Sequence, residues 1–162
     1  MVVCGLPGAG KTTLAVALEA DLGAVRLSAD DWLVDLGLDL FSSEARERVE
    51  QLQWRLCQRL LTLGQRVVVE WGSWGRAERD HLREGARRLG AEVELHVLDA
   101  SVAVLWERVR RRGLEQRHGG RALTRDDLEA YAALFERPDE HELARYDPPL
   151  SRAPAGGAGS GR

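Results

Sequence analysis

Residues 4–13 read CGLPGAGKTT, and this stretch constrains the fold more than any other part of the chain. It has the spacing G-x-x-x-x-G-K-S/T of a Walker A phosphate-binding loop, at Gly5, Gly10, Lys11 and Thr12. The glycines allow backbone N–H groups to turn toward a phosphate, and the following helix adds the partial positive charge of its N-terminus. We expect Lys11 to reach the β- and γ-phosphates of ATP and Thr12 to offer its hydroxyl to Mg²⁺. The expected nucleotide-binding residues are Gly5, Leu6, Pro7, Gly8, Ala9, Gly10, Lys11, Thr12 and Thr13.

The segments on either side of the loop have the context that a Walker A motif requires. The apolar run 1–4 precedes it as a short buried strand, and 12–23 follows as a helix with Gly23 at its end. Lys11 is also the only lysine of the chain. The alternative is a glycine-rich turn that binds no nucleotide, and the strand, loop and helix order argues against it.

The rest of the chain alternates between apolar segments and amphipathic ones. We expect strands at 1–4, 24–28, 66–71 and 91–100, and helices at 12–23, 42–64, 76–90, 101–112 and 123–136. The helix 42–64 is expected to bury the side that carries Val49, Leu52, Leu56, Leu60 and Leu63. This alternation predicts an α/β fold, a doubly wound parallel sheet with helices on both faces. Residues 1–148 form the expected domain, 149–162 an expected disordered tail rich in Gly, Ala and Pro, and 144–150 offers the candidate for a fifth strand.

Composition narrows the class of protein. No apolar run approaches the roughly 20 residues that a membrane span needs, and we find no export signal, so we expect a cytoplasmic protein without a membrane partner. Cys4 and Cys57 lack metal-binding spacing and are expected to be free thiols. The formal net charge of −3 makes nucleic acid a less favoured partner, although a local arginine cluster could still serve one.

Acidic residues follow two of the predicted strands, where ligands bind in such sheets. Asp30 and Asp31 come after the second strand, and either could accept the proton of an acceptor hydroxyl during phosphoryl transfer. Consecutive side chains point in different directions, so we expect one of them to act. The alternative is that they only cap a short helix that runs through Leu36. Glu70 ends the third strand in the Walker B position, where it could hold Mg²⁺ through water or contact the substrate, or be an ordinary polar strand end.

Aromatic and basic residues add two further candidates. Trp32, Trp71 and Trp74 could line an acceptor site with a flat apolar wall, although core packing is the ordinary role of tryptophan. The predicted helix 101–112 leads into an arginine cluster that could form a mobile lid over the phosphates, or be a solvated helix end: Arg108, Arg110, Arg111, Arg112 and Arg117.

With these segments in place, the chain from Met1 to about Asp147 resembles the small P-loop kinases. That group includes polynucleotide kinase, chloramphenicol phosphotransferase, zeta-toxin-like kinases and short bacterial proteins described as AAA family ATP-binding proteins. The resemblance is carried by CGLPGAGKTTLA, RLSADDWL, VVVEWGSW and LWERVRRRG. It implies that the first acid of the pair, Asp30, is the general base and that Arg108 and Arg112 are lid arginines that contact the nucleotide. Nothing in the sequence resembles the helical domain of AAA+ remodelling motors.

Residues and resemblance together predict an ATP-dependent kinase. It would use ATP and Mg²⁺ to phosphorylate a hydroxyl of a small molecule, such as an antibiotic, a nucleoside or a sugar derivative. The expected catalytic residues are Asp30, Lys11, Arg108 and Arg112; the substrate contacts Asp30, Trp32, Glu70 and Trp71; and the Mg²⁺ site Thr12 and Glu70. Two alternatives stay open: a 5′-hydroxyl polynucleotide kinase, and a nucleotide-binding switch without an acceptor.

Overall fold

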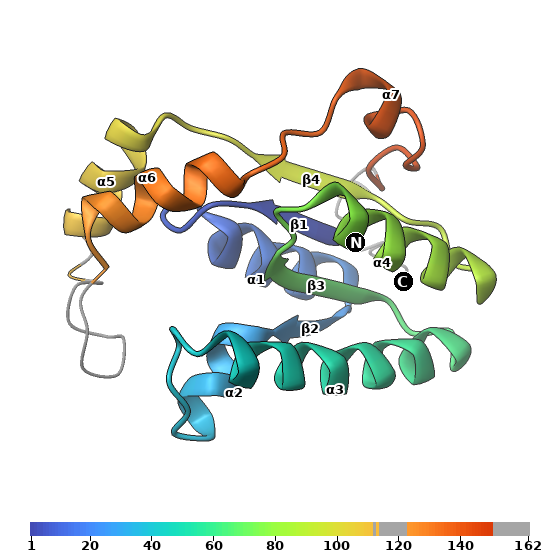
Figure 1. Cartoon of the computed structure of the whole chain (residues 1–162). Helices are drawn as coiled ribbons and strands as arrows, with labels where there is room; N and C mark the ends of the chain where they lie inside the picture. Colours follow the sequence, from blue (N-terminus) through green and yellow to red (C-terminus); the bar gives the residue numbers. More distant parts are fainter. Residues whose placement is uncertain (112, 114–122, 151–162) are drawn as a thin grey trace, which may run out of the picture.

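The computed structural model describes residues 1–111, 113 and 123–150. Its centre is a four-stranded sheet with the order β2-β3-β1-β4, formed by β1 (Val2–Gly5), β2 (Val25–Ser28), β3 (Val67–Gly72) and β4 (Leu95–Leu98) (Figure 1). All three strand pairs are parallel. The parallel arrangement confirms the predicted doubly wound α/β fold, and it brings the carboxyl ends of the strands to one edge of the sheet.

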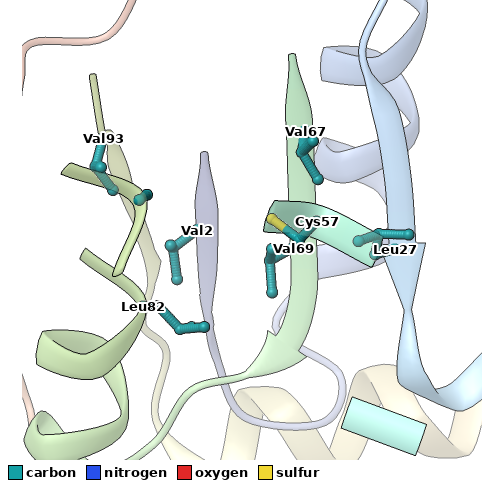
Figure 2. Packing of buried hydrophobic residues seen from close by; sticks show 8 residues of the cluster. Val2, Leu27, Cys57, Val67, Val69, Leu82 and Val93 are labelled. Carbon is teal, nitrogen blue, oxygen red and sulfur yellow. The ribbon is translucent and has the colours of Figure 1, made fainter. Parts of the chain in front are cut away.

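Apolar side chains cover both faces of the sheet, which explains why the strands read as continuous apolar runs. Val67 and Val69 face a core cluster that includes Cys57 of α3 (Ser43–Thr62) and Leu82 of α4 (Arg76–Arg88) (Figure 2). Val68 faces the opposite side, against Ala15 of α1 (Lys11–Leu22). The central strands β1 and β3 are therefore buried on both faces, whereas the four residues of β4 are partly exposed.

The helices begin and end near the residues that the sequence indicated. Gly23 ends α1 with a φ of 59°, and the Ser42 side chain caps α3 by accepting a hydrogen bond from the Ala45 N–H. Thr124 and Asp127 form a capping box at the start of α6 (Arg125–Leu134). The remaining helices are α2 (Ala29–Asp35), α5 (Val102–Arg111) and α7 (Glu140–Leu143).

The expected buried side of α3 is correct only in part, and the candidate for a fifth strand is not a strand. On α3, Val49 is buried and Leu56 and Leu60 pack against the core, as expected, whereas Leu52 and Leu63 are exposed and the other buried positions are Gln53 and Cys57. The reason is that the Gln53 amide satisfies its hydrogen-bonding groups inside the protein, by donating to the Ser28 carbonyl at 2.9 Å and accepting from the Trp71 indole at 2.6 Å. In the described residues, 144–150 forms no fifth strand; its backbone is held beside β4 through Asp147, which contacts Val93.

A buried arginine anchors the segments that follow β3 and α6. The guanidinium of Arg79 is fully buried and pairs with Glu142, with 2.6 Å between Nε and Oε1. It also donates to the carbonyls of Ser73, Trp74 and Glu136. This network fixes the loop that begins at Ser73, which lines the cavity described below.

Two further findings concern the cysteines and the membrane. Cys4 and Cys57 are both buried free thiols, as expected, and burial raises the pKa of each to about 11. No helix in the described part of the chain is long and apolar enough to span a bilayer.

Candidate functional site

The phosphate loop connects β1 to α1 and depends on its glycines for conformation and space. Gly5, Gly8 and Gly10 have φ values of 153°, 81° and 102°. A Cβ at Gly5 would lie 2.5 Å from the Leu98 carbonyl oxygen, and one at Gly8 would lie 2.9 Å from the Leu105 carbonyl oxygen. No atom lies within 4 Å of the corresponding point at Gly10. The first two glycines therefore allow close packing, while Gly10 supplies the left-handed turn that starts α1.

Lys11 begins α1 and folds back over the loop, where its ammonium donates a hydrogen bond to the Leu6 carbonyl at 3.2 Å. Burial lowers the pKa of Lys11, and the nearby carboxylates of Asp30 and Glu70 oppose that shift. The side chain also lines a cavity at the carboxyl edge of the sheet. A phosphate bound in this place would stabilise the charged form of the Lys11 ammonium.

Glu70 joins the phosphate loop to β3, which continues past it to Gly72 and pairs with β1. The Thr12 hydroxyl donates to its Oε1 at 2.5 Å, and Arg26 Nε donates to its Oε2 at 2.7 Å. Hydroxyl and carboxylate oxygens are the donors that Mg²⁺ takes in proteins, usually together with several waters. Thr12 and Glu70 therefore fit a Mg²⁺ site, and a group of three or more His, Cys, Asp or Glu ligands is absent from the described residues.

The two aspartates after β2 point to different partners, as their adjacency predicts. Asp30 pairs with Arg46 at 2.5 Å, while Asp31 pairs with Arg26 at 2.7 Å. The helix cap at this point is Ser28, whose hydroxyl accepts from the Asp31 N–H, so neither aspartate side chain caps α2. Of the two, Asp30 lines the cavity that also contains Lys11.

That cavity has a volume of about 400 Å³ and lies between the phosphate loop, the start of α3 and the loop after β3. One part of its wall is aromatic and aliphatic, formed by Leu40, Phe41, Trp71, Trp74, Leu123 and Tyr131. Trp32 is not part of the wall that the described residues form. It packs instead beside Ala29 and Leu33 of its own helix, because α2 turns its apolar side toward α3.

Three charged residues of the cavity were missed by the sequence analysis: Arg46, Glu50 and Glu78. Arg46 and Glu50 are four residues apart on α3 and pair with each other at 3.6 Å. Burial raises the pKa of Glu50 to about 7, with smaller contributions from Glu78 and Asp30, while Arg46 opposes the shift. Burial also raises the pKa of Glu78. The i, i+4 spacing on the cavity side of α3 was visible in the sequence, but it resembled an ordinary surface pair.

The arginine cluster falls partly beyond what the structure describes, since Arg108, Arg110 and Arg111 lie in the last turn of α5. Arg108 is exposed in the last turn of α5, and it is not among the cavity-lining residues. Arg112 and Arg117 lie outside the described residues. The helix itself packs on the phosphate loop through Leu105 and Val109, which contact Gly8.

Comparisons with known proteins place this geometry in a family. A family model described as an AAA domain matches residues 1–138. The crystal structure of a gluconokinase from Sinorhizobium meliloti 1021 is 21% identical, covers 89% of this chain and 86% of that chain, and superposes with a TM-score of 0.60. Chaetomium thermophilum Kti12 in complex with ADP-AlF3 is 22% identical, with 85% and 80% covered and a TM-score of 0.65.

A third solved structure, of the Pnkp1/Rnl/Hen1 RNA repair complex, is 20% identical with a TM-score of 0.70. The match covers 94% of this chain but 47% of that one. No curated protein sequence matches the chain at a significant level. At these identities the three structures establish a shared fold.

Proposed function

The chain belongs to the AAA domain family and has the fold of the small P-loop kinases, and from this premise we propose that it is an ATP-dependent phosphotransferase whose acceptor is a hydroxyl of a small molecule. The observation that carries the proposal is that Lys11 of the phosphate loop and Asp30 line the same cavity. A phosphate held by the loop and a carboxylate able to take a proton thus face one space that an acceptor can enter.

In the proposed reaction, the acceptor hydroxyl attacks the γ-phosphorus of ATP while the bond from that phosphorus to the bridging oxygen breaks. ADP leaves with the electron pair, and Asp30 takes the hydroxyl proton. Arg46 holds the Asp30 carboxylate in place by their 2.5 Å ion pair. Lys11 offsets the negative charge of the phosphates during transfer.

Mg²⁺, when bound, would neutralise charge on the β- and γ-phosphates. The residues that would hold it are Thr12 and Glu70, directly or through water. Arg26 contributes by fixing Glu70 from the side opposite Thr12. We also propose Arg108, in the last turn of α5, and Arg112 as cations that interact with the phosphates.

The features of the cavity favour a small acceptor. Its volume of about 400 Å³ lies in the range of pockets for small molecules, roughly 300–1,000 Å³. Trp71 stands beside Glu70 in its wall and is proposed to contact the acceptor. The carboxylates around Arg46 disfavour a polynucleotide, whose phosphates need a basic track. A switch without an acceptor would not need Asp30 in this position.

The experiment that tests the proposal is a transfer screen. The purified chain receives ATP labelled on its γ-phosphate, Mg²⁺, and either pooled hydroxyl metabolites or short 5′-hydroxyl oligonucleotides. Label on a metabolite in the wild type, and none with Lys11→Ala, supports the proposal. Label on the oligonucleotides favours the polynucleotide kinase, and release of inorganic phosphate alone favours the switch.

A further inference from the structure

We propose that the acceptor carries a protonated amine as well as its hydroxyl, and that the amine sits between Glu50 and Glu78 against the aromatic wall of the cavity. This inference rests on the proposed function, because it names the class of acceptor for the same site. It concerns groups that phosphoryl transfer itself does not use.

The first argument is the balance of charge on the acceptor side of the cavity. Asp30, Glu50 and Glu78 converge there, from α2, α3 and α4 respectively. Arg46 serves Asp30 at 2.5 Å and Glu50 at the longer distance of 3.6 Å. In the described residues Glu78 has no ion pair of its own, and its bonds go to the Gly75 backbone and toward Ser73. The other cations nearby are Lys11, which faces Asp30, and Arg79, which is already paired with Glu142. Glu50 thus has only the longer Arg46 contact and Glu78 has no ion pair in the described residues, which leaves room for a further cation.

The pKa values of Glu50 and Glu78 agree with this shortage of nearby positive charge. Burial raises the pKa of Glu50 to about 7 and also raises the pKa of Glu78. The groups that face Glu50 are Arg46 on its own helix, Asp30 on α2 and Glu78 on α4. A protonated amine between the two glutamates would favour their charged forms and so offset the cost of desolvation.

The second argument is the aromatic wall, whose rings are already fixed. Trp71 donates from its indole to Gln53 at 2.6 Å, and Trp74 donates to the Gly5 carbonyl at 3.1 Å. The rings of Trp74 and Tyr131 lie 4.9 Å apart between centroids, with a 40° angle between planes. Aromatic faces beside carboxylates are the combination that binds ammonium groups, through cation–π attraction and charge. Because the rings need little reordering, they lose little entropy on binding.

A third observation concerns Ser73, at the start of the loop after β3. Ser73 lines the cavity, its side chain is 2% exposed, and its φ of 46° is unusual for a residue other than glycine. Its hydroxyl lies beside Glu78 and helps to lower the pKa of that carboxyl, but it completes no hydrogen bond of ordinary geometry within the described part of the chain. The same carboxylates would repel an acceptor that carries a carboxylate or a phosphate.

The test uses three probes of matched shape: 2-phenylethylamine, 2-phenylethanol and phenylacetate. Calorimetric titration of the full chain at pH 8 without ATP measures their affinities. We expect the amine to bind about tenfold more tightly than the alcohol and the acid, a difference expected for one added ion pair in a partly buried site. Affinity equal to that of the alcohol, or absence of amine binding, would overturn the inference.

Variants assign the effect to the two glutamates. Glu50→Gln and Glu78→Gln should each weaken amine binding about fivefold and leave alcohol binding unchanged. Glu47→Gln, an exposed change on the same helix as Glu50, is the matched control. Wild-type amine affinity in both glutamate variants would contradict the placement. In the wild type, amine affinity should rise between pH 5.5 and 8 as Glu50 ionises, while alcohol affinity stays level.

Measuring amine binding and phosphate transfer separately distinguishes a failure of this inference from a failure of the proposed kinase function. Lys11→Ala should keep selective amine binding and lose transfer. If the wild type binds the amine selectively but transfers phosphate to no acceptor, the kinase proposal fails and the amine site stands. If neutral alcohols are phosphorylated and the amine does not bind, the kinase proposal stands and the amine site fails.

Discussion

The hydroxyl of Thr12 lies 2.5 Å from Oε1 of Glu70, so the first turn of α1 and the end of β3 meet through one carboxylate. The other oxygen of that carboxylate accepts from Arg26 Nε at 2.7 Å. Glu70 is therefore held from two sides at the point where the phosphate loop begins its helix.

Glu70→Gln should raise the Mg²⁺ concentration needed for half-maximal transfer about 10–100-fold, because the variant keeps the shape and loses the charge that attracts the cation. The measurement is the transfer rate as a function of Mg²⁺ at saturating ATP. Glu94→Gln, at another buried glutamate whose partner is His96, serves as control and should leave the Mg²⁺ requirement unchanged. An unchanged requirement in Glu70→Gln would remove Glu70 from the metal site.

Gly5→Ala should lower the free energy of unfolding by about 1–3 kcal/mol more than Gly90→Ala does. Both positions have positive φ, 153° and 79°, but the added Cβ meets the Leu98 carbonyl at 2.5 Å at Gly5 and no atom within 4 Å at Gly90. Urea unfolding of the two variants measures the difference. Equal losses would mean that the loop relaxes without cost and that close packing on β4 is unimportant.

Glu50→Gln should make the protein more stable at pH 8 than the wild type, by about 1–3 kcal/mol, with a smaller gain at pH 5.5. Burial raises the pKa of Glu50 from 4.5 to about 7, so the folded protein holds a proton that the unfolded chain has lost. The stability of the wild type therefore falls as the pH rises through this window, and glutamine removes that dependence. Urea unfolding at the two pH values checks it; a variant less stable than the wild type at pH 8 would show that the Arg46 pair outweighs burial.

Arg108→Ala should lower kcat about 10-fold or more while changing ATP affinity little, because its charge is proposed to act mainly in the transition state. Arg111 lies three residues further along α5 and pairs with Glu107 at 3.3 Å, so Arg111→Ala is the control and should have little effect. Steady-state kinetics and nucleotide titration separate the two quantities. Equal kcat in both variants and the wild type would leave Arg108 as a solvated helix end.

Local patterns in the sequence predicted most of the fold, because they have local physical causes. The loop at Gly5–Thr12 fixes the link from β1 to α1, continuous apolar runs such as 66–71 indicate strands buried on two faces, and caps such as Thr124 mark helix starts. The resemblance to the small P-loop kinases is confirmed by the family match and the fold. The buried face of α3 was predicted only in part, because the positions of leucines cannot show that Gln53 would find two partners inside the protein.

The candidate site was only partly visible for the same reason. Residues next to strand ends, such as Asp30 and Glu70, follow from the topology of a parallel sheet. Arg46 and Glu78 reach the cavity from helices whose placement depends on tertiary packing, so their sequence spacing carried no distinct signal. Trp32 illustrates the reverse case, since its position near a strand end suggested the cavity wall but α2 turns it toward the core cluster with Leu33.

The most direct measurement of the central claim is single-turnover transfer by Asp30→Asn and Asp31→Asn, with ATP affinity determined in parallel. The acceptor is the one identified by the labelled-ATP screen. Asp30 lines the cavity with Lys11, whereas Asp31 pairs with Arg26. Asparagine keeps the shape but cannot take a proton, so Asp30→Asn should bind ATP normally and transfer about 10²–10⁴-fold more slowly, and Asp31→Asn should lose far less. Transfer at the wild-type rate by Asp30→Asn, or a larger loss in Asp31→Asn, would contradict the account.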